Sequence, residues 1–169
     1  METEAAIEQF TLQDDGVFPN SSLPALLYKD VLDIPFLFPA TNLKQLFKNN
    51  GWSNSWDAGI FEYHHYHSIT HEVLGIYKGQ TTLLLGGPSG QKIFVQKGDV
   101  LIIPAGVAHK NLGRENAVGV VGAYPHGHAY DMNYGKAGER SATDENISRV
   151  PIPSRDPIGL TNGLLKLWK

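Results

Sequence analysis

Residues 59–72 are the most informative part of this chain, and they have the sequence Gly-Ile-Phe-Glu-Tyr-His-His-Tyr-His-Ser-Ile-Thr-His-Glu. The aromatic-rich part at 60–67 is typical of a β-strand. Alternate side chains of a strand share a face, so His65 and His67 point the same way and Tyr66 points the opposite way. Two imidazoles on one face of a rigid strand can reach the same metal ion.

Two later residues extend this pair of candidate ligands. Glu72 stands five residues after His67, an offset that would place it on the wrong face of a continuous strand. We therefore expect the chain to turn through residues 68–70. The apolar run at 100–103 is followed by a Pro-Ala-Gly turn and then by His109, which predicts two short strands joined by a tight corner that presents His109 to an interior.

These spacings resemble the two sequence motifs of the cupin superfamily. The first motif is glycine, five residues, His-x-His, four residues, glutamate, six residues and glycine, and the chain matches it at Gly59, His65, His67, Glu72 and Gly79. The second is glycine, five residues, Pro-x-Gly, two residues, histidine, three residues and asparagine, and the matching positions are Gly98, Pro104, Gly106 and His109. Gly113 stands where the closing asparagine is expected and Asn111 comes two residues earlier, so the role of that asparagine is not carried over.

The resemblance implies a metal site inside a small β-barrel. By its motifs, one divalent ion would be coordinated by His65, His67, Glu72 and His109. Three imidazoles and one carboxylate include no soft thiolate, so iron, manganese, nickel, copper, cobalt and zinc are all compatible. Octahedral coordination by four protein groups would leave two positions for water or substrate.

The remaining histidines have other expected positions. Strand parity places His64 opposite His65 and His71 opposite Glu72, so both should face away from the barrel interior. His126 and His128 repeat the His-x-His spacing, but Pro125 and Gly127 mark a turn there, in which that spacing does not guarantee a shared face. We expect both in a loop, near the barrel mouth.

Parity with the ligands also predicts a mainly apolar cavity for a small organic molecule. The residues expected to line it are Phe61, Tyr63, Leu74, Ile76, Val107 and Asn111. Tyr63 and Asn111 would be its polar groups, although an aromatic of the barrel core with a locally bonded hydroxyl is favoured for Tyr63 over a catalytic role.

The short, regularly spaced strands predict an all-β, single-domain antiparallel sandwich or barrel with a short flanking helix and extended terminal arms. The resemblance implies that this is the cupin jelly roll, a double-stranded β-helix barrel. Residues 1–51 should form an arm, extended from about Phe10 to Asp33, and a helix beginning near Pro39 that packs outside the barrel. Residues 52–130 form the barrel, and residues 131–169 a surface wrap that docks Trp168 or contributes to a subunit interface. The expected strands lie at 60–67, 72–77, 80–85, 92–95, 100–103, 107–112 and 117–124.

Composition narrows the class of partner. A length of 169 residues fits one domain, and a net charge of −3 without a lysine or arginine cluster argues against nucleic acid. No apolar stretch is long enough to span a membrane and the acidic N-terminus does not resemble a secretory signal, so we expect a cytoplasmic protein without a membrane partner. Cysteine is absent, which excludes disulfides and thiol chemistry. The apolar-punctuated termini around a barrel favour a homodimer.

Two classes of function are compatible with these residues. The leading hypothesis is a small metalloenzyme that acts on a chelating small molecule, by dioxygenase-like or Lewis-acid chemistry. A sugar or keto-acid isomerase ranks below it, because no inward position beyond the ligands offers a histidine or carboxylate as a proton shuttle; a catalytic His126 or His128 would reverse that order. The alternative from another class is a metal-dependent binding protein without turnover, since fold does not decide function.

Overall fold

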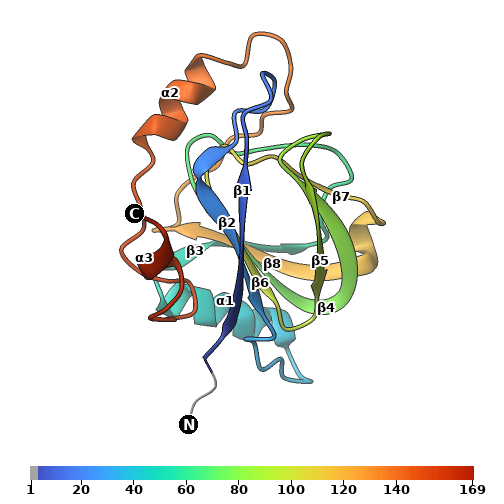
Figure 1. Ribbon diagram of the computed structural model, residues 1–169. Helices are drawn as coiled ribbons and strands as arrows, with labels where there is room; N and C mark the ends of the chain where they lie inside the picture. Colours follow the sequence, from blue (N-terminus) through green and yellow to red (C-terminus); the bar gives the residue numbers. More distant parts are fainter. Residues whose placement is uncertain (1–3) are drawn as a thin grey trace.

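Residues 4–169 are described by the structure, a computed structural model whose elements are labelled in Figure 1. Its strands are β1 (Ala6–Leu12), β2 (Ser21–Lys29), β3 (Trp52–Ala58), β4 (Glu72–Leu85), β5 (Gln91–Gln96), β6 (Val100–Ile103), β7 (His109–Asn111) and β8 (Val118–Pro125). The helices are α1 (Pro39–Asn49), the 3-10 turn η1 (Glu115–Ala117), α2 (Ala142–Arg149) and α3 (Leu164–Leu167). Every strand pair is antiparallel. The predicted all-β jelly roll is therefore confirmed.

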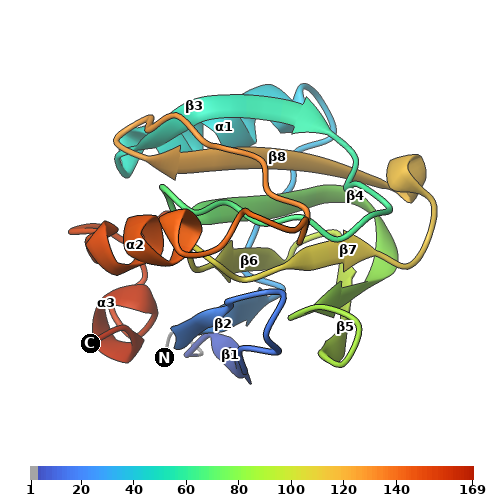
Figure 2. The same ribbon diagram turned by 90° about the horizontal axis from the view of Figure 1, so that it is seen from above.

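Strand β4 connects the two halves of the barrel. Its first part, from Glu72 to Gly79, pairs with β6 and β8, whereas its second part, from Gln80 to Leu85, pairs with β5 and β7. A register shift between Ile76 and Lys78 bends the strand between these parts. On one side of this bend the sheet has the order β1-β2-β6-β4-β8-β3, and Figure 2 shows β5 and β7 beside it at the other end of the molecule.

Both faces of the main sheet are buried. Inward side chains such as Leu101 and Ile103 belong to the barrel core, while their neighbours Val100 and Ile102 pack on the outer face. Helix α1 covers that outer face with Leu43 and Phe47, and the C-terminal segment covers it with Leu164 and Trp168. The apolar run at 100–103 is unbroken because alternate residues enter two different cores.

Several predicted elements agree with the structure and others differ from it. The flanking helix is confirmed as α1, which begins at Pro39 and ends before Asn50-Gly51. The predicted strand at 60–67 is wrong as a regular strand, because its backbone makes only isolated bridges, from His65 to His109 and from Tyr66 to Asn133. Strand β3, at residues 52–58, was not predicted and pairs with β8.

The terminal segments, predicted as extended arms, contain regular strands and helices. The N-terminal segment is extended as expected, but it is hydrogen-bonded into the main sheet as β1 and β2, and β2 pairs with β6. The segments 72–77 and 80–85, predicted separately, form one bent strand. The polar stretch after Ser141 forms the short helix α2, which was not predicted from the residue pattern. No helix between residues 4 and 169 combines the length and the apolar character needed to cross a membrane.

The docking of the C-terminal tail gives a test of stability. Trp168 is 2% exposed, donates its indole N–H to the Pro24 carbonyl at 2.8 Å, and lies 4.7 Å from the His71 ring. We expect Trp168→Ala to lower the free energy of unfolding by about 3–5 kcal/mol in urea denaturation. Leu165→Ala, at a side chain that is 44% exposed, should change it by less than about 0.5 kcal/mol. Equal effects of the two substitutions would contradict this packing.

Candidate metal centre

Three imidazoles meet at one end of the barrel interior. His65 and His67 lie on the irregular segment before β4, and His109 is the first residue of β7. Their ligand nitrogens all lie within 4.8 Å of one another, and all three side chains are buried. The backbone bridge between His65 and His109 holds the two segments together, and their ring centroids are 4.1 Å apart. This trio could hold a metal ion.

The orientation of each imidazole is set by a backbone carbonyl. Nδ1 of His65 contacts the Tyr63 carbonyl at 3.0 Å, Nδ1 of His67 contacts that of Asp131 at 2.6 Å, and Nδ1 of His109 contacts that of Val107 at 3.1 Å. A carbonyl oxygen only accepts, so each Nδ1 carries the hydrogen. Each Nε2 therefore presents its lone pair, which is the arrangement that metal-binding histidines require.

Glu72 faces this trio from the first position of β4. One carboxylate oxygen lies 3.3 Å from Nε2 of His67 and the other lies 3.4 Å from Nε2 of His109. The side chain is only 3% exposed. A buried carboxylate this close to two imidazole nitrogens needs a positive charge between them, which either a proton on an imidazole or a bound metal ion can supply. The nitrogen and oxygen donors fit a divalent transition metal.

The electrostatic environment favours the metal-binding protonation state at Glu72 and His65, whereas at His67 it favours the protonated ring, so metal binding there would release a proton. Burial, together with the neighbouring His109, lowers the pKa of His65 to about 3. Burial alone would raise the pKa of Glu72, but His67 and His109 outweigh it and hold that pKa well below its usual range. For His67, burial would lower the pKa, but the carboxylate of Glu72 raises it. Glu72 therefore stays anionic and His65 stays neutral.

A chain of two hydrogen bonds fixes the Glu72 carboxylate. Trp56 donates its indole N–H to the Tyr124 hydroxyl oxygen at 2.8 Å, and Tyr124 donates its own proton to Glu72 Oε2 at 2.6 Å. Burial and the Glu72 charge raise the pKa of Tyr124, so it remains a donor. A Cβ at Gly122 would lie 2.2 Å from the indole ring, so a glycine is needed for Trp56 to lie against β8.

The segment after β8 supports the other side of the site. Besides accepting from His67 through its carbonyl, Asp131 accepts through its carboxylate from the backbone N–H of Ser68 at 2.7 Å and from the Ser68 hydroxyl. Asn133 donates to the same carboxylate at 2.8 Å. These contacts fix the turn between His67 and Glu72 that brings both side chains to one centre.

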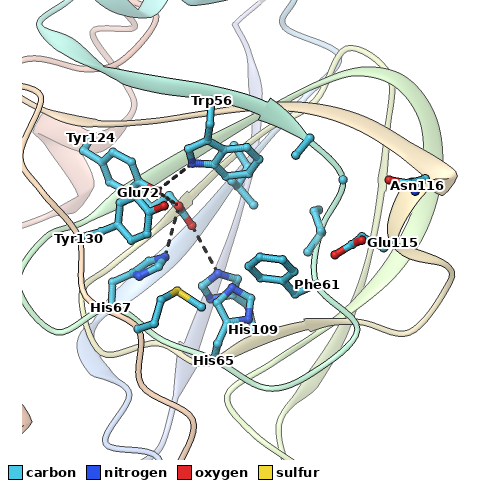
Figure 3. A pocket seen from close by; sticks show the side chains of 15 residues that line it. Trp56, Phe61, His65, His67, Glu72, His109, Glu115, Asn116, Tyr124 and Tyr130 are labelled. Atoms are coloured by element: carbon cyan, nitrogen blue, oxygen red, sulfur yellow. Dashed lines mark hydrogen bonds and ion pairs between the residues drawn. The ribbon is translucent and has the colours of Figure 1, made fainter.

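A cavity of about 310 Å³ opens beside the ligands. Figure 3 shows the ligands at one end of it with Tyr124 and Tyr130 beside them, Trp56 across from His109, and Glu115 and Asn116 at the far end beyond Phe61. The lining residues are Trp56, Ala58, Gly59, Ile60, Phe61, His65, His67, Glu72, Leu74, His109, Glu115, Asn116, Tyr124, Tyr130 and Met132. Its size and mainly apolar walls suit a small organic molecule.

The structure brings all four predicted ligands together, whereas the predicted lining residues separate into two groups. Phe61 and Leu74 line the cavity. Tyr63 is 45% exposed and stacks on Phe61 at 4.9 Å from the outside. Ile76 and Val107 do not line it, because they are fully packed in the barrel core. Strand parity gives the correct face for Ile76, but this residue lies deeper in the barrel than the cavity.

Asn111 is buried but lies outside the lining of the cavity as well. Its amide donates to the carbonyls of Ile60 and Arg114 at 3.3 and 3.0 Å. Its carbonyl oxygen accepts from the Thr81 hydroxyl at 2.7 Å and from the N–H of Gly113 at 2.9 Å. Asn111 therefore joins β7 to the segments on either side of the cavity mouth and has a structural role.

The other histidines lie away from the metal centre. The His64 ring contacts Phe18 at 5.4 Å between centroids. His71 is buried behind the site, where it bonds the Pro151 carbonyl at 3.0 Å and accepts from the N–H of Ala105 at 2.9 Å. His126 and His128 line a separate cavity of about 330 Å³.

Several residues of the site were not identified from the sequence. Tyr124 could have been found, because it has the same parity as the inward residues Val118 and Val120 in the predicted strand at 117–124. Trp56 precedes the expected strands, and Asp131 acts from a loop through its backbone. Neither Trp56 nor Asp131 has a sequence pattern that points to the site.

The histidine geometry predicts which substitutions remove metal. His65→Ala and His109→Ala each delete one converging Nε2, so bound metal measured by elemental mass spectrometry should fall at least about tenfold. His64→Ala changes the neighbouring histidine, which points elsewhere, and should retain wild-type metal. Equal loss in all three variants, with unchanged circular dichroism, would refute this assignment.

The Tyr124 hydrogen bond predicts a weaker site when it is removed. Tyr124→Phe should reduce metal affinity by about 10- to 100-fold, measured by competition with a chromogenic chelator, because Glu72 loses the donor that orients it. Tyr77→Phe is a matched control, since Tyr77 donates to Asp57 at 2.5 Å near the surface. An unchanged affinity in Tyr124→Phe would show that the hydrogen bond does not support the carboxylate.

Comparison with known proteins identifies a family by sequence. No family model matches the chain. Solved structures similar to it include cupin-type proteins: acireductone dioxygenase from Bacillus anthracis with a cadmium ion in its active centre (15% identity, 77% of this chain and 83% of that chain, TM-score 0.43), and a DUF861 family protein from Thermotoga maritima (24% identity, 54% and 92%, TM-score 0.32). The sequence is 38% identical over 167 residues to the uncharacterized protein YjlB of Bacillus subtilis (strain 168), covering 98% of both proteins. The chain therefore belongs to the same family as YjlB.

Proposed function

We propose that this protein is a small metalloenzyme in which His65, His67, Glu72 and His109 hold one divalent transition metal. Its substrate would be a small organic molecule that chelates this metal from the adjacent cavity. The observation that carries the proposal is the convergence of three Nε2 lone pairs, each directed by an Nδ1 hydrogen bond to a carbonyl, on a buried carboxylate. Such a cluster of acceptors is stable when a cation joins them.

The nitrogen and oxygen ligands are compatible with several divalent transition metals. Iron, manganese, nickel, copper, cobalt and zinc all accept imidazole and carboxylate ligands. When bound, such an ion supplies Lewis-acid polarisation of a chelated oxygen, and in the case of a redox-active metal it supplies a centre for oxygen chemistry.

The protein's own side chains would bind and orient the substrate. Phe61, Trp56 and Leu74 form apolar walls that exclude water from a bound ligand. Tyr124 holds Glu72 in place, and its hydroxyl is fully engaged between Trp56 and Glu72. Tyr124 therefore positions a ligand of the metal and is not free to exchange protons with a substrate.

The contents of the cavity favour dioxygenase-like chemistry over isomerisation. An isomerase needs a proton-transferring group close to the substrate carbon. Among the described residues, the lining beyond the ligands includes no histidine, its one other carboxylate is Glu115 at the far end, and its hydroxyl groups are those of Tyr124 and Tyr130. Because His126 and His128 line a different cavity, neither is placed to serve this one.

Metal analysis tests the site first. Protein purified without chelators or a histidine tag should contain close to one equivalent of transition metal per chain by elemental mass spectrometry. Glu72→Ala should lose most of it, whereas Glu8→Ala, at an exposed carboxylate on β1, should not. A wild-type protein that is metal-free and also refuses added metal would overturn the proposal.

Oxygen uptake then separates enzyme from binding protein. The metal-loaded protein should consume oxygen with at least one member of a panel of diketones, thiols, flavonols and aromatic diols. A panel compound that binds the loaded protein without any turnover would instead support a metal-dependent binding protein.

A further inference from the structure

We infer that the cavity selects a flat ligand with two different ends: an anionic chelating end for the metal, and a cationic or hydrogen-bond-donating end that Glu115 recognises. This inference rests on the proposed function and specifies its substrate class. It concerns the end of the cavity that is remote from the metal ligands.

The charges along the cavity are the first line of evidence. A divalent ion beside the carboxylate of Glu72 leaves the inner end cationic, which suits an anionic chelating group. In the part of the chain that the structure describes, neither lysine nor arginine lines the cavity. The charged side chain at the outer end is Glu115, which is half-buried. A second anionic group on the ligand would therefore meet a carboxylate without a compensating cation.

Backbone contacts fix the position of Glu115 at the mouth of the cavity. Glu115 starts the turn η1, and its carbonyl accepts from the N–H of Ile60 at 3.2 Å. A Cβ at Gly59 would lie 1.9 Å from that carbonyl oxygen, so this close approach requires a glycine. Glu62, which does not line the cavity, accepts from the N–H of Glu115 at 3.2 Å and so helps to hold the start of η1.

The positive charge of Arg114 does not neutralise the Glu115 carboxylate inside the cavity. Arg114 directly precedes Glu115, but its side chain is exposed and is not part of the lining. Asn116, the other polar residue at this end, offers an amide that accepts as well as donates. The outer end therefore accepts hydrogen bonds and attracts positive charge.

The shape of the walls indicates a planar ligand. Tyr130 stacks on Tyr124 with ring centroids 4.9 Å apart and an interplanar angle of 22°, and this aromatic pair lines the cavity beside the metal ligands. Trp56 and Phe61 add further aromatic faces. Aromatic faces bind flat rings by stacking and also attract ammonium groups. A cavity of about 310 Å³ admits a ligand of about one ring with a short substituent.

A series of three catechols that differ only in the tail tests this inference. The probes are 4-methylcatechol, which is neutral, 4-(2-aminoethyl)catechol, which is cationic, and 3,4-dihydroxyphenylacetate, which is anionic. Each is titrated by calorimetry, without oxygen, into zinc-loaded protein, because zinc is not redox-active. We expect the cationic catechol to bind about tenfold more tightly than the anionic one.

Substitution of Glu115 locates the origin of this preference. Glu115→Gln keeps the shape of the side chain and removes its charge, so the ratio of the two affinities should fall to about twofold or less while the neutral catechol and the zinc content stay unchanged. Glu8→Gln removes a distant carboxylate as a matched control and should keep the wild-type ratio.

The outcomes separate this inference from the proposed function. Equal affinities for the cationic and anionic catechols, or a ratio unchanged in Glu115→Gln, would overturn the role of Glu115. If 4-methylcatechol still bound zinc-loaded protein and not metal-free protein, the metal site and its chelating ligand would stand. Absence of binding by all three catechols would overturn the inferred ligand class, whereas failure to load zinc would count against the metal site itself.

Discussion

Three hydrogen bonds from imidazole Nδ1 atoms to backbone carbonyls are the constraint on which this site depends. Because the acceptors belong to Tyr63, Val107 and Asp131, the tautomer of each histidine is fixed by main-chain atoms. Three lone pairs and the Glu72 carboxylate are consequently directed at one another in a buried space. A positive charge, either a proton on an imidazole or a bound metal ion, is needed between these groups, and the backbone carbonyls hold the rings in the orientation that accepts it.

The barrel explains how such distant residues meet. Strand β4 starts at Glu72 inside the site and then bends to pair with β7, which starts at His109. The inner core anchors these strands, and the outer face is covered by α1 and by Trp168. The loop that carries Asp131 then closes the turn between His67 and Glu72. Regular strands thus hold Glu72 and His109, while side-chain contacts from a loop hold the irregular segment of His65 and His67.

The sequence predicted those elements and contacts that follow from local residue patterns. It did not predict the contacts that loops make after the chain has folded. The apolar alternation of β6 and the helix α1 were predictable, because period and turn residues determine them. The four candidate ligands were recognised through their spacing, although the segment at 60–67 is not a regular strand. Val107 and Ile76 were placed at the cavity because parity gives the face of a strand and not the depth along it. The contacts of Asp131 and Trp56 arise from tertiary packing, which no local pattern records.

The two carboxylates that line the cavity, Glu72 and Glu115, have different environments. We infer that Glu72 serves the metal site and that Glu115 serves ligand selection. Glu72 is buried and held by Tyr124, so changing it disturbs the charge balance of the metal centre. Glu115 lies on the short turn η1 at the rim and is reached by solvent, so its charge can change at little cost to the fold. The proposed metal ligands therefore lie on the barrel strands and on the irregular segment before β4, and we infer that ligand selection resides on the separate turn η1.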